Sequence, residues 1–287
     1  MTSTRHPLQS VVEACAPLKF APLPDIRVPE MRIVRAHPGS EHWYRTDLMV
    51  AEGAVPVLLE KIASTNGPQH RLPAATHFLR ALLREPIFLV AAGSYLTGRA
   101  PLLDREHLWF PWRCSGNFGT PTITSPRVAV STDDDYAGHH DAVAVEATEF
   151  DTVVAAGMVG AFSPIIDAVH EHSRVGRRVL WGWVLDTLHF YMLNPARFLG
   201  YDAKAAWERA RRLGEAFVDA GATTQSRPRL FPFCENHPRG TWAVRGTCCF
   251  EYKGDPAHGF CTTCPLKDDS LRREELREWL RDPALAP

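Results

Sequence analysis

Four of the chain's seven cysteines lie within seventeen residues, and this cluster constrains the fold more than any other feature of the sequence. They are the adjacent pair Cys248 and Cys249 and, after eleven intervening residues, Cys261 and Cys264 in a C-x-x-C arrangement. The N-terminal residues lack the continuous apolar stretch of a secretory signal, so we expect a cytoplasmic protein. In a reducing compartment, such a cluster indicates a metal or redox site rather than a disulfide framework.

The spacing of the cysteines places a specific demand on the backbone. A C-x-x-C element lets two thiolates turn toward one metal while backbone N–H groups point at the sulfurs. Adjacent side chains diverge, so Cys248 and Cys249 need a bent backbone, which we expect Gly246 to permit. A turn at residues 253–256 would then bring the two halves together.

Four thiolates leave three interpretations open. Structural zinc takes four cysteines, usually from two C-x-x-C-like knuckles. A [2Fe–2S] cluster also takes four cysteines, but its two irons spread the ligands wider. The third interpretation is that the cysteines are reactive thiols or lie together incidentally. An adjacent pair makes a poor zinc knuckle, and this favours the [2Fe–2S] cluster.

The segment resembles the C-terminal signature of the FhuF-type ferric siderophore reductases. That signature is an Arg-x-x-Cys-Cys element, an aromatic and a basic residue, and then Cys-x-x-Cys-Pro-Leu. The matching residues here are Arg245, Cys248, Cys249, Tyr252, Lys253, Cys261, Cys264, Pro265 and Leu266. The gap between the two cysteine pairs is longer by a single residue than is usual in the family.

The resemblance implies a cytoplasmic enzyme that reduces the Fe(III) of an imported siderophore, and it points to hydroxamates as the substrate class. Oxygen-donor siderophores hold Fe(III) tightly and Fe(II) weakly, so one electron releases the metal. The four cysteines would hold the [2Fe–2S] cluster. Arg245, Lys253 and His258 are candidates for tuning the cluster or contacting the substrate.

The rest of the chain predicts an α+β fold that is mainly helical. Apolar residues at helical spacing predict helices near residues 8–14, 55–62, 75–83, 153–172, 178–193, 203–220 and 270–280. Short β-type segments at 106–112, 127–131 and 142–147 predict a small central antiparallel sheet. We therefore expect a siderophore-binding helical body over residues 1–230, with its sheet at about 101–150, and a loop-rich iron–sulfur module over 231–287.

Charge and composition restrict the partners. The formal net charge of −1 gives no overall basic field, so we expect no nucleic-acid partner. No run approaches the roughly 18 apolar residues of a membrane span, so we expect no integral membrane segment. The sequence also lacks a Gly-rich nucleotide fingerprint, so a separate donor, a ferredoxin or a flavin reductase, is expected to supply electrons.

Two further groups of residues are worth testing. His139 and His140 follow an acidic run at 133–135, which suggests either a second metal site or, as we favour, a polar hairpin tip. Asp186 and His189 lie three residues apart on a predicted helix and are candidates for a buried polar pair.

Two other functions remain open for the whole chain. The first is a siderophore- or small-molecule-binding protein with a structural zinc in a four-cysteine site. The second is an iron–sulfur redox sensor or electron carrier that does not release iron.

Overall fold

The computed structural model describes residues 5–18, 32–33, 43–66, 71–113, 118–235, 237, 239–254, 257 and 259–281. The helices in these ranges are α1 (Pro7–Cys15), α2 (Thr46–Ala51), α3 (Ala54–Asn66), α4 (Arg71–Thr97), α5 (Phe150–Ser173), α6 (Arg177–Leu199), α7 (Ala203–Asp219), α8 (Glu251–Gly254) and α9 (Asp269–Arg281). The strands are β1 (Arg32–Ile33), β2 (Trp43–Arg45), β3 (Ala100–Pro101), β4 (Leu108–Pro111), β5 (Thr122–Ile123), β6 (Val128–Ser131), β7 (Ala142–Val145), β8 (Arg229–Pro232) and β9 (Thr241–Val244). The predicted α+β, mainly helical class is confirmed.

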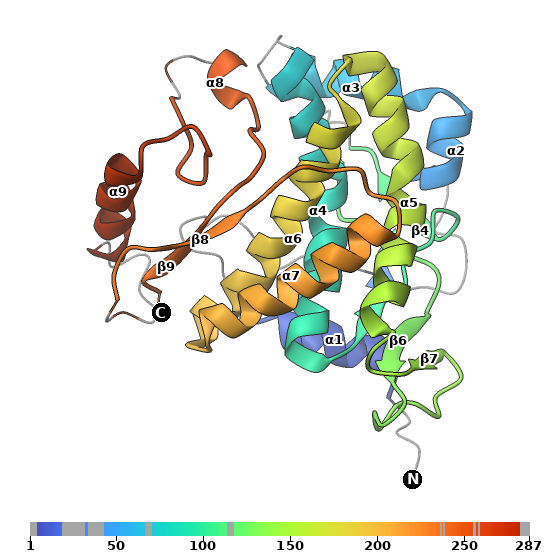
Figure 1. Cartoon of the computed structure of the whole chain (residues 1–287). Helices are drawn as coiled ribbons and strands as arrows, with labels where there is room; N and C mark the ends of the chain where they lie inside the picture. Colours follow the sequence, from blue (N-terminus) through green and yellow to red (C-terminus); the bar gives the residue numbers. More distant parts are fainter. Residues whose placement is uncertain are drawn as a thin grey trace.

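Long helices form the body of the molecule, and α6 runs through it beside α4 and α7 (Figure 1). Edge-to-face ring pairs join them: Phe88 of α4 lies 5.2 Å from Tyr191 of α6, and Trp181 lies 5.3 Å from Phe217 of α7. The helices α4 and α5 continue through Pro86 and Pro164. Core packing stabilises both helices beyond the hydrogen bond that each proline removes.

Helix α5 is long and apolar enough to cross a membrane, by length and composition alone. Half of its most apolar window is buried inside the molecule, and it packs against α3 and α7. The core helix of a soluble protein has the same composition, so this is weak evidence for a span. The absence of a membrane segment stays a prediction.

The predicted single antiparallel sheet over residues 101–150 is wrong in its topology. Strand β4 belongs to a sheet of order β1-β5-β4-β2, whereas β6 and β7 belong to a second sheet of order β3-β6-β7. Strands β6 and β7 pair in parallel, with Val128 opposite Ala142. Residue alternation identifies strands but carries no information on their direction, which here depends on the turns between β6 and β7.

The C-terminal segment lies on one side of the helical body (Figure 1). Strands β8 and β9 pair antiparallel, and a separate small core joins them to α9. Its buried residues are Phe231, Phe233, Trp242, Val244 and Leu276. Phe190 of α6 packs against this core and against the main one. Strand β8 spans the predicted boundary at residue 230, and that boundary stays a prediction.

Candidate metal centre

The four cysteines predicted to act together do meet in one place, and we call them the four-thiol group (Cys248, Cys249, Cys261 and Cys264). The sulfurs of Cys249 and Cys261 lie 3.9 Å apart. The Cys264 thiol is in hydrogen-bond contact with both Cys248 and Cys261. All four are free cysteines on loops, so their sulfurs are available to a metal.

The contacts between the sulfurs form a series: Cys249 contacts Cys261, Cys261 contacts Cys264, and Cys264 contacts Cys248. Four thiolates about 2.3 Å from a single tetrahedral metal all lie about 3.8 Å from one another. Among the residues that the structure describes, the one trio of candidate ligand atoms lying within 4.8 Å of each other belongs to His6, His139 and Asp141. No three sulfurs of the four-thiol group meet that spacing.

The adjacent cysteines are turned by the backbone on both sides. Gly246 lies in a bend before the pair, as predicted. A Cβ there would overlap the backbone of Arg227 and the hydroxyl of Ser226, so the position requires glycine for space. After the pair, Phe250 has a positive φ of 62°, and its N–H donates to the Cys248 sulfur at 3.3 Å. This left-handed residue redirects the chain away from the sulfurs.

Asp186 of α6 fixes the loop that carries Cys248 and Cys249. One carboxylate oxygen accepts from the Ser226 hydroxyl at 2.5 Å and from Gly246 N–H at 3.1 Å. The other accepts from Thr247 N–H at 2.8 Å. Burial raises the pKa of Asp186 to about 6, although these hydrogen bonds and the Arg245 charge oppose the shift.

The predicted Asp186–His189 pair is wrong, because the two side chains have different partners. His189 contacts the Leu185 carbonyl at 2.9 Å through Nδ1, and its ring lies 4.8 Å from that of Trp207. Burial lowers the pKa of His189 to about 4, so the ring is neutral at pH 7. Sequence spacing placed the two residues on one helix but could not identify their partners in other segments.

Arg245 is the residue outside the four-thiol group that contacts the sulfurs most directly. Its Nη2 donates to the Cys261 sulfur at 2.6 Å and to the Cys249 sulfur at 3.2 Å. Burial alone would lower the pKa of Arg245, but the charges of Cys261, Cys249 and Asp186 raise it overall. Arg245 is therefore a fixed cation beside two sulfurs, and its role in tuning a cluster stays a prediction.

The thiols of Cys248 and Cys249 differ in pKa. Hydrogen bonding by Cys264 lowers the pKa of Cys248 to about 7, and the Phe250 N–H and the Arg245 charge act in the same direction. The contact with Cys261, followed by burial, raises the pKa of Cys249. Because the thiolate is the metal-binding form, Cys248 is the thiol of these two that deprotonates more readily near neutral pH.

The other predicted tuning residues differ in position. Lys253 is exposed, and its ammonium lies 5.6 Å from the centre of the Phe250 ring. Tyr252, the aromatic residue of the signature, packs edge-to-face on Phe260 at 5.1 Å. His258 lies outside the described residues.

Helices α4 and α9, which lie far apart in the sequence, also bond to the loops of the four-thiol group. In α4, the Thr76 hydroxyl donates to the Cys249 carbonyl at 2.9 Å, and His77 and Arg80 contact Glu251 of α8. These contacts attach the loop after Cys249 to the helical body.

In α9, the fully buried Arg272 holds the C-x-x-C loop. Its guanidinium donates to three carbonyls, those of Thr262 at 2.9 Å, Cys264 at 2.6 Å and Lys267 at 2.9 Å. The sequence gives no signal for this role, since Arg272 is one of several charged residues on the helix.

A cavity of about 750 Å³ lies between α4, α6 and the C-terminal segment. Cys249 and Cys261 line it, whereas Cys248 and Cys264 are absent from its walls. Its aromatic lining residues are Trp183, Phe190, Tyr191, Trp242, Phe260 and Trp279. Its charged lining residues are Arg80, Arg84, Arg245, Lys267, Asp186, Glu251 and Glu275. Basic and acidic groups nearly balance, so the cavity suits a bulky ligand with little net charge.

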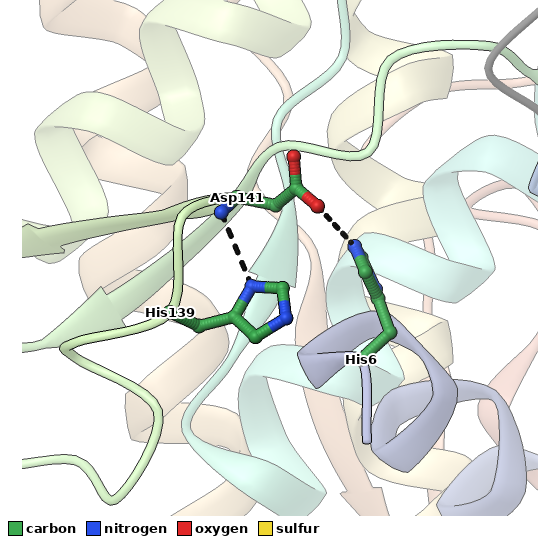
Figure 2. A group of neighbouring side chains, drawn as sticks. All are labelled: His6, His139 and Asp141. Carbon is green, nitrogen blue, oxygen red and sulfur yellow. Dashed lines mark hydrogen bonds and ion pairs between the residues drawn. The ribbon is translucent and has the colours of Figure 1, made fainter. Parts of the chain in front are cut away.

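A second polar group joins α1 to the turn before β7, and Figure 2 shows its members His6, His139 and Asp141. His6 Nε2 lies 3.1 Å from Asp141 Oδ2, and His140 Nε2 lies 3.0 Å from the same oxygen. The turn is polar, as predicted, but it is not a hairpin tip because β6 and β7 are parallel.

The hydrogen bonds of these histidines oppose metal binding. The Nδ1 atoms of His6 and His139 accept the backbone N–H groups of Leu8 and Asp141, each at 3.1 Å. Each neutral ring therefore carries its proton on Nε2, the atom that a metal would need. Metal-ligating histidines instead donate their second ring N–H to an acceptor. The group is a hydrogen-bonded connection between α1 and the sheet.

No protein-family model, curated protein or solved structure matches the chain. The resemblance to the FhuF-type reductases therefore stays a prediction from the C-terminal residues.

Proposed function

We propose that this chain is a ferric siderophore reductase that holds a [2Fe–2S] cluster on the four-thiol group. One observation carries the proposal: Cys249 and Cys261 belong to a group of four converging thiols and also line a cavity of about 750 Å³. A redox centre beside a cavity of ligand size is the arrangement that such a reaction needs.

The donor set supports iron–sulfur chemistry over structural zinc. No three of the sulfurs lie mutually within 4.8 Å, whereas one tetrahedral ion holds all four about 3.8 Å apart. N–H groups of Phe250 and Arg245 point at three of the sulfurs. Such hydrogen bonds tune the potential of iron–sulfur clusters. When bound, a [2Fe–2S] cluster supplies a one-electron carrier at this position.

The residues of the cavity support a chelate as the ligand. Aromatic walls such as Trp183 and Phe260 offer apolar surface, and Arg84 offers donors to the oxygens of a ligand. The near balance of charge favours ferric hydroxamates, which carry little net charge, over highly anionic chelates. Fe(III) is held tightly by hard oxygen donors and Fe(II) weakly, so transfer of one electron releases the metal.

The remaining parts of the proposal follow from the sequence. We place the protein in the cytoplasm, where imported siderophores and reduced donors meet. A ferredoxin or a flavin reductase supplies the electron, because the sequence carries no nucleotide fingerprint of its own.

A single-turnover experiment tests the proposal. Protein reduced with dithionite, then freed of it without oxygen, is mixed with a ferric trihydroxamate and a ferrous chelator. We expect the protein to reoxidise and one Fe(II) to appear for each electron lost. A reduced cluster that fails to react with every hydroxamate tried would favour an electron carrier or redox sensor, and a colourless zinc protein would favour a binding protein.

A further inference from the structure

We infer that Cys249 and Cys261 bind the same iron, and that Arg245 makes this the side of the cluster that holds the transferred electron. The inference rests on the proposed [2Fe–2S] reductase function and assigns roles to individual residues within it.

The distance between the two sulfurs supports their pairing. Two thiolates on one tetrahedral iron lie about 3.8 Å apart at metal–sulfur distances of about 2.3 Å, and the sulfurs of Cys249 and Cys261 lie 3.9 Å apart. Cys264 contacts both Cys248 and Cys261, and pairing it with Cys248 is the assignment in which each iron would hold two sulfurs that contact each other. Each pair thus combines one residue of the C-C element with one of the C-x-x-C element.

Arg245 makes the two sides unequal. Its Nη2 contacts both sulfurs of the Cys249–Cys261 pair, at 3.2 and 2.6 Å. On the other side, the Cys248 sulfur accepts a neutral backbone N–H from Phe250 at 3.3 Å. A charge-assisted donor stabilises added negative charge more than a neutral one does, so the added electron is favoured beside Arg245.

The cavity lies on the same side. Cys249, Cys261 and Arg245 line it together, so the electron is held on the side that faces the ligand. Cys249 and Cys261 would hold the iron on the cavity side, and the bound cluster would supply a carrier for one electron from an external donor to the Fe(III) of the chelate, which becomes Fe(II). No bond of the chain breaks in this exchange.

Three variants test the role of Arg245, with Arg273 of α9 as the control. Arg245→Gln removes the charge and the geometry of the donor, and Arg245→Lys keeps the charge. Arg273→Gln removes an arginine charge that is bonded to the Pro232 carbonyl instead of to a sulfur. The readouts are the midpoint potential, the EPR g-values and the Mössbauer ferrous doublet of the reduced protein.

We expect R245Q to lower the potential and change both spectra, R245K to recover part of the shift, and R273Q to resemble the parent protein. Spectra and potentials of R245Q equal to those of R273Q would overturn the inference. A protein without any [2Fe–2S] signal would instead overturn the proposed function.

A measurement on the unaltered chain covers the case in which R245Q does not assemble a cluster. With [¹⁵N]arginine incorporated, electron–nuclear double resonance of the reduced protein should detect guanidinium nitrogen at hydrogen-bond distance from the sulfurs. Absence of that coupling would overturn the role of Arg245, because its Nη2 would then not contact the reduced cluster.

Discussion

At the residue scale, one glycine and one buried aspartate of α6 position the loop that carries the four-thiol group's first two cysteines. Gly182 lets the loop before Cys248 approach the helix, since a Cβ there would overlap the Thr247 hydroxyl. Asp186, one turn further along, accepts three hydrogen bonds from that loop and from Ser226. Neither residue binds a metal, yet both determine where the cysteines lie.

Replacing Gly182 by alanine should therefore displace this loop. We expect Gly182→Ala to lower the free energy of unfolding by about 1–3 kcal/mol, as overpacking does, and to reduce cluster occupancy. Chemical denaturation and iron content measure the two effects.

Gly160 of α5 is the matched control for this substitution. A Cβ at Gly160 meets no atom within 4 Å, so Gly160→Ala should raise stability by about 0.5–1 kcal/mol through helix propensity. If both substitutions changed the free energy of unfolding and the iron content equally, the close approach of Thr247 to Gly182 would not be important.

The raised pKa of Asp186 predicts a pH dependence of stability. Burial raises its pKa to about 6, so the folded state binds this proton more tightly than the unfolded state does. The stabilisation is complete below the unfolded pKa and is lost as the pH rises through 6. Between pH 5 and 7 the free energy of unfolding should fall by about 1 kcal/mol more for the parent than for Asp186→Asn. If the free energy of unfolding changed with pH equally in the two proteins, the raised pKa of Asp186 would be contradicted.

At the element scale, the group is held between helices from distant parts of the sequence. Helix α4 contacts the Cys249 side through Thr76, α6 holds the preceding loop, and α9 holds the C-x-x-C loop through Arg272. The C-terminal loops therefore depend on the helical body and on α9 for their shape.

Arg272 gives the sharpest test of this dependence. A lysine in its place cannot reach the three carbonyls at once, so Arg272→Lys should cost about 2–4 kcal/mol of stability and loosen the C-x-x-C loop. The neighbouring Arg273 is bonded to the Pro232 carbonyl at an exposed position, and Arg273→Lys should change stability by less than about 0.5 kcal/mol. Thermal unfolding and the rate of iron loss to a chelator distinguish these outcomes, and similar rates for both variants would contradict the role of Arg272.

Local pattern predicted the helices better than their contacts. The helix predicted near residues 203–220 begins after Asp202, whose carboxylate accepts the N–H of Lys204 at 2.8 Å. Such a cap depends on neighbouring residues alone. The pairing of β6 with β7 and the contact of Asp186 with Thr247 depend on segments that meet only in the folded chain. The cysteines could be grouped from their spacing, whereas Arg272 and Thr76 could not be connected with them.

At the scale of the whole molecule, the central feature is a group of thiols beside a cavity. The helical body supplies one wall through Trp183 and Tyr191, and the C-terminal segment supplies the other through Phe260, Cys261 and Trp279. This shared lining is why a ligand in the cavity would contact both parts of the chain.

Removing a single ligand should abolish the metal centre. We expect Cys261→Ala and Cys264→Ala to lose colour and reductase activity together, since each leaves three thiolates for two irons. Cys15, a buried thiol in α1 whose pKa burial raises to about 12, is the control. Cys15→Ala should keep the colour, and retained colour in the two ligand variants would mean that the ligands are misassigned.

The most direct test of the central claim is an absorption and EPR spectrum of protein purified without oxygen, together with its metal content. A [2Fe–2S] centre predicts a reddish-brown protein with two irons and two sulfides per chain, and an EPR signal that appears on reduction with dithionite. A colourless protein that contains one zinc per chain and gives no signal after reduction would contradict it.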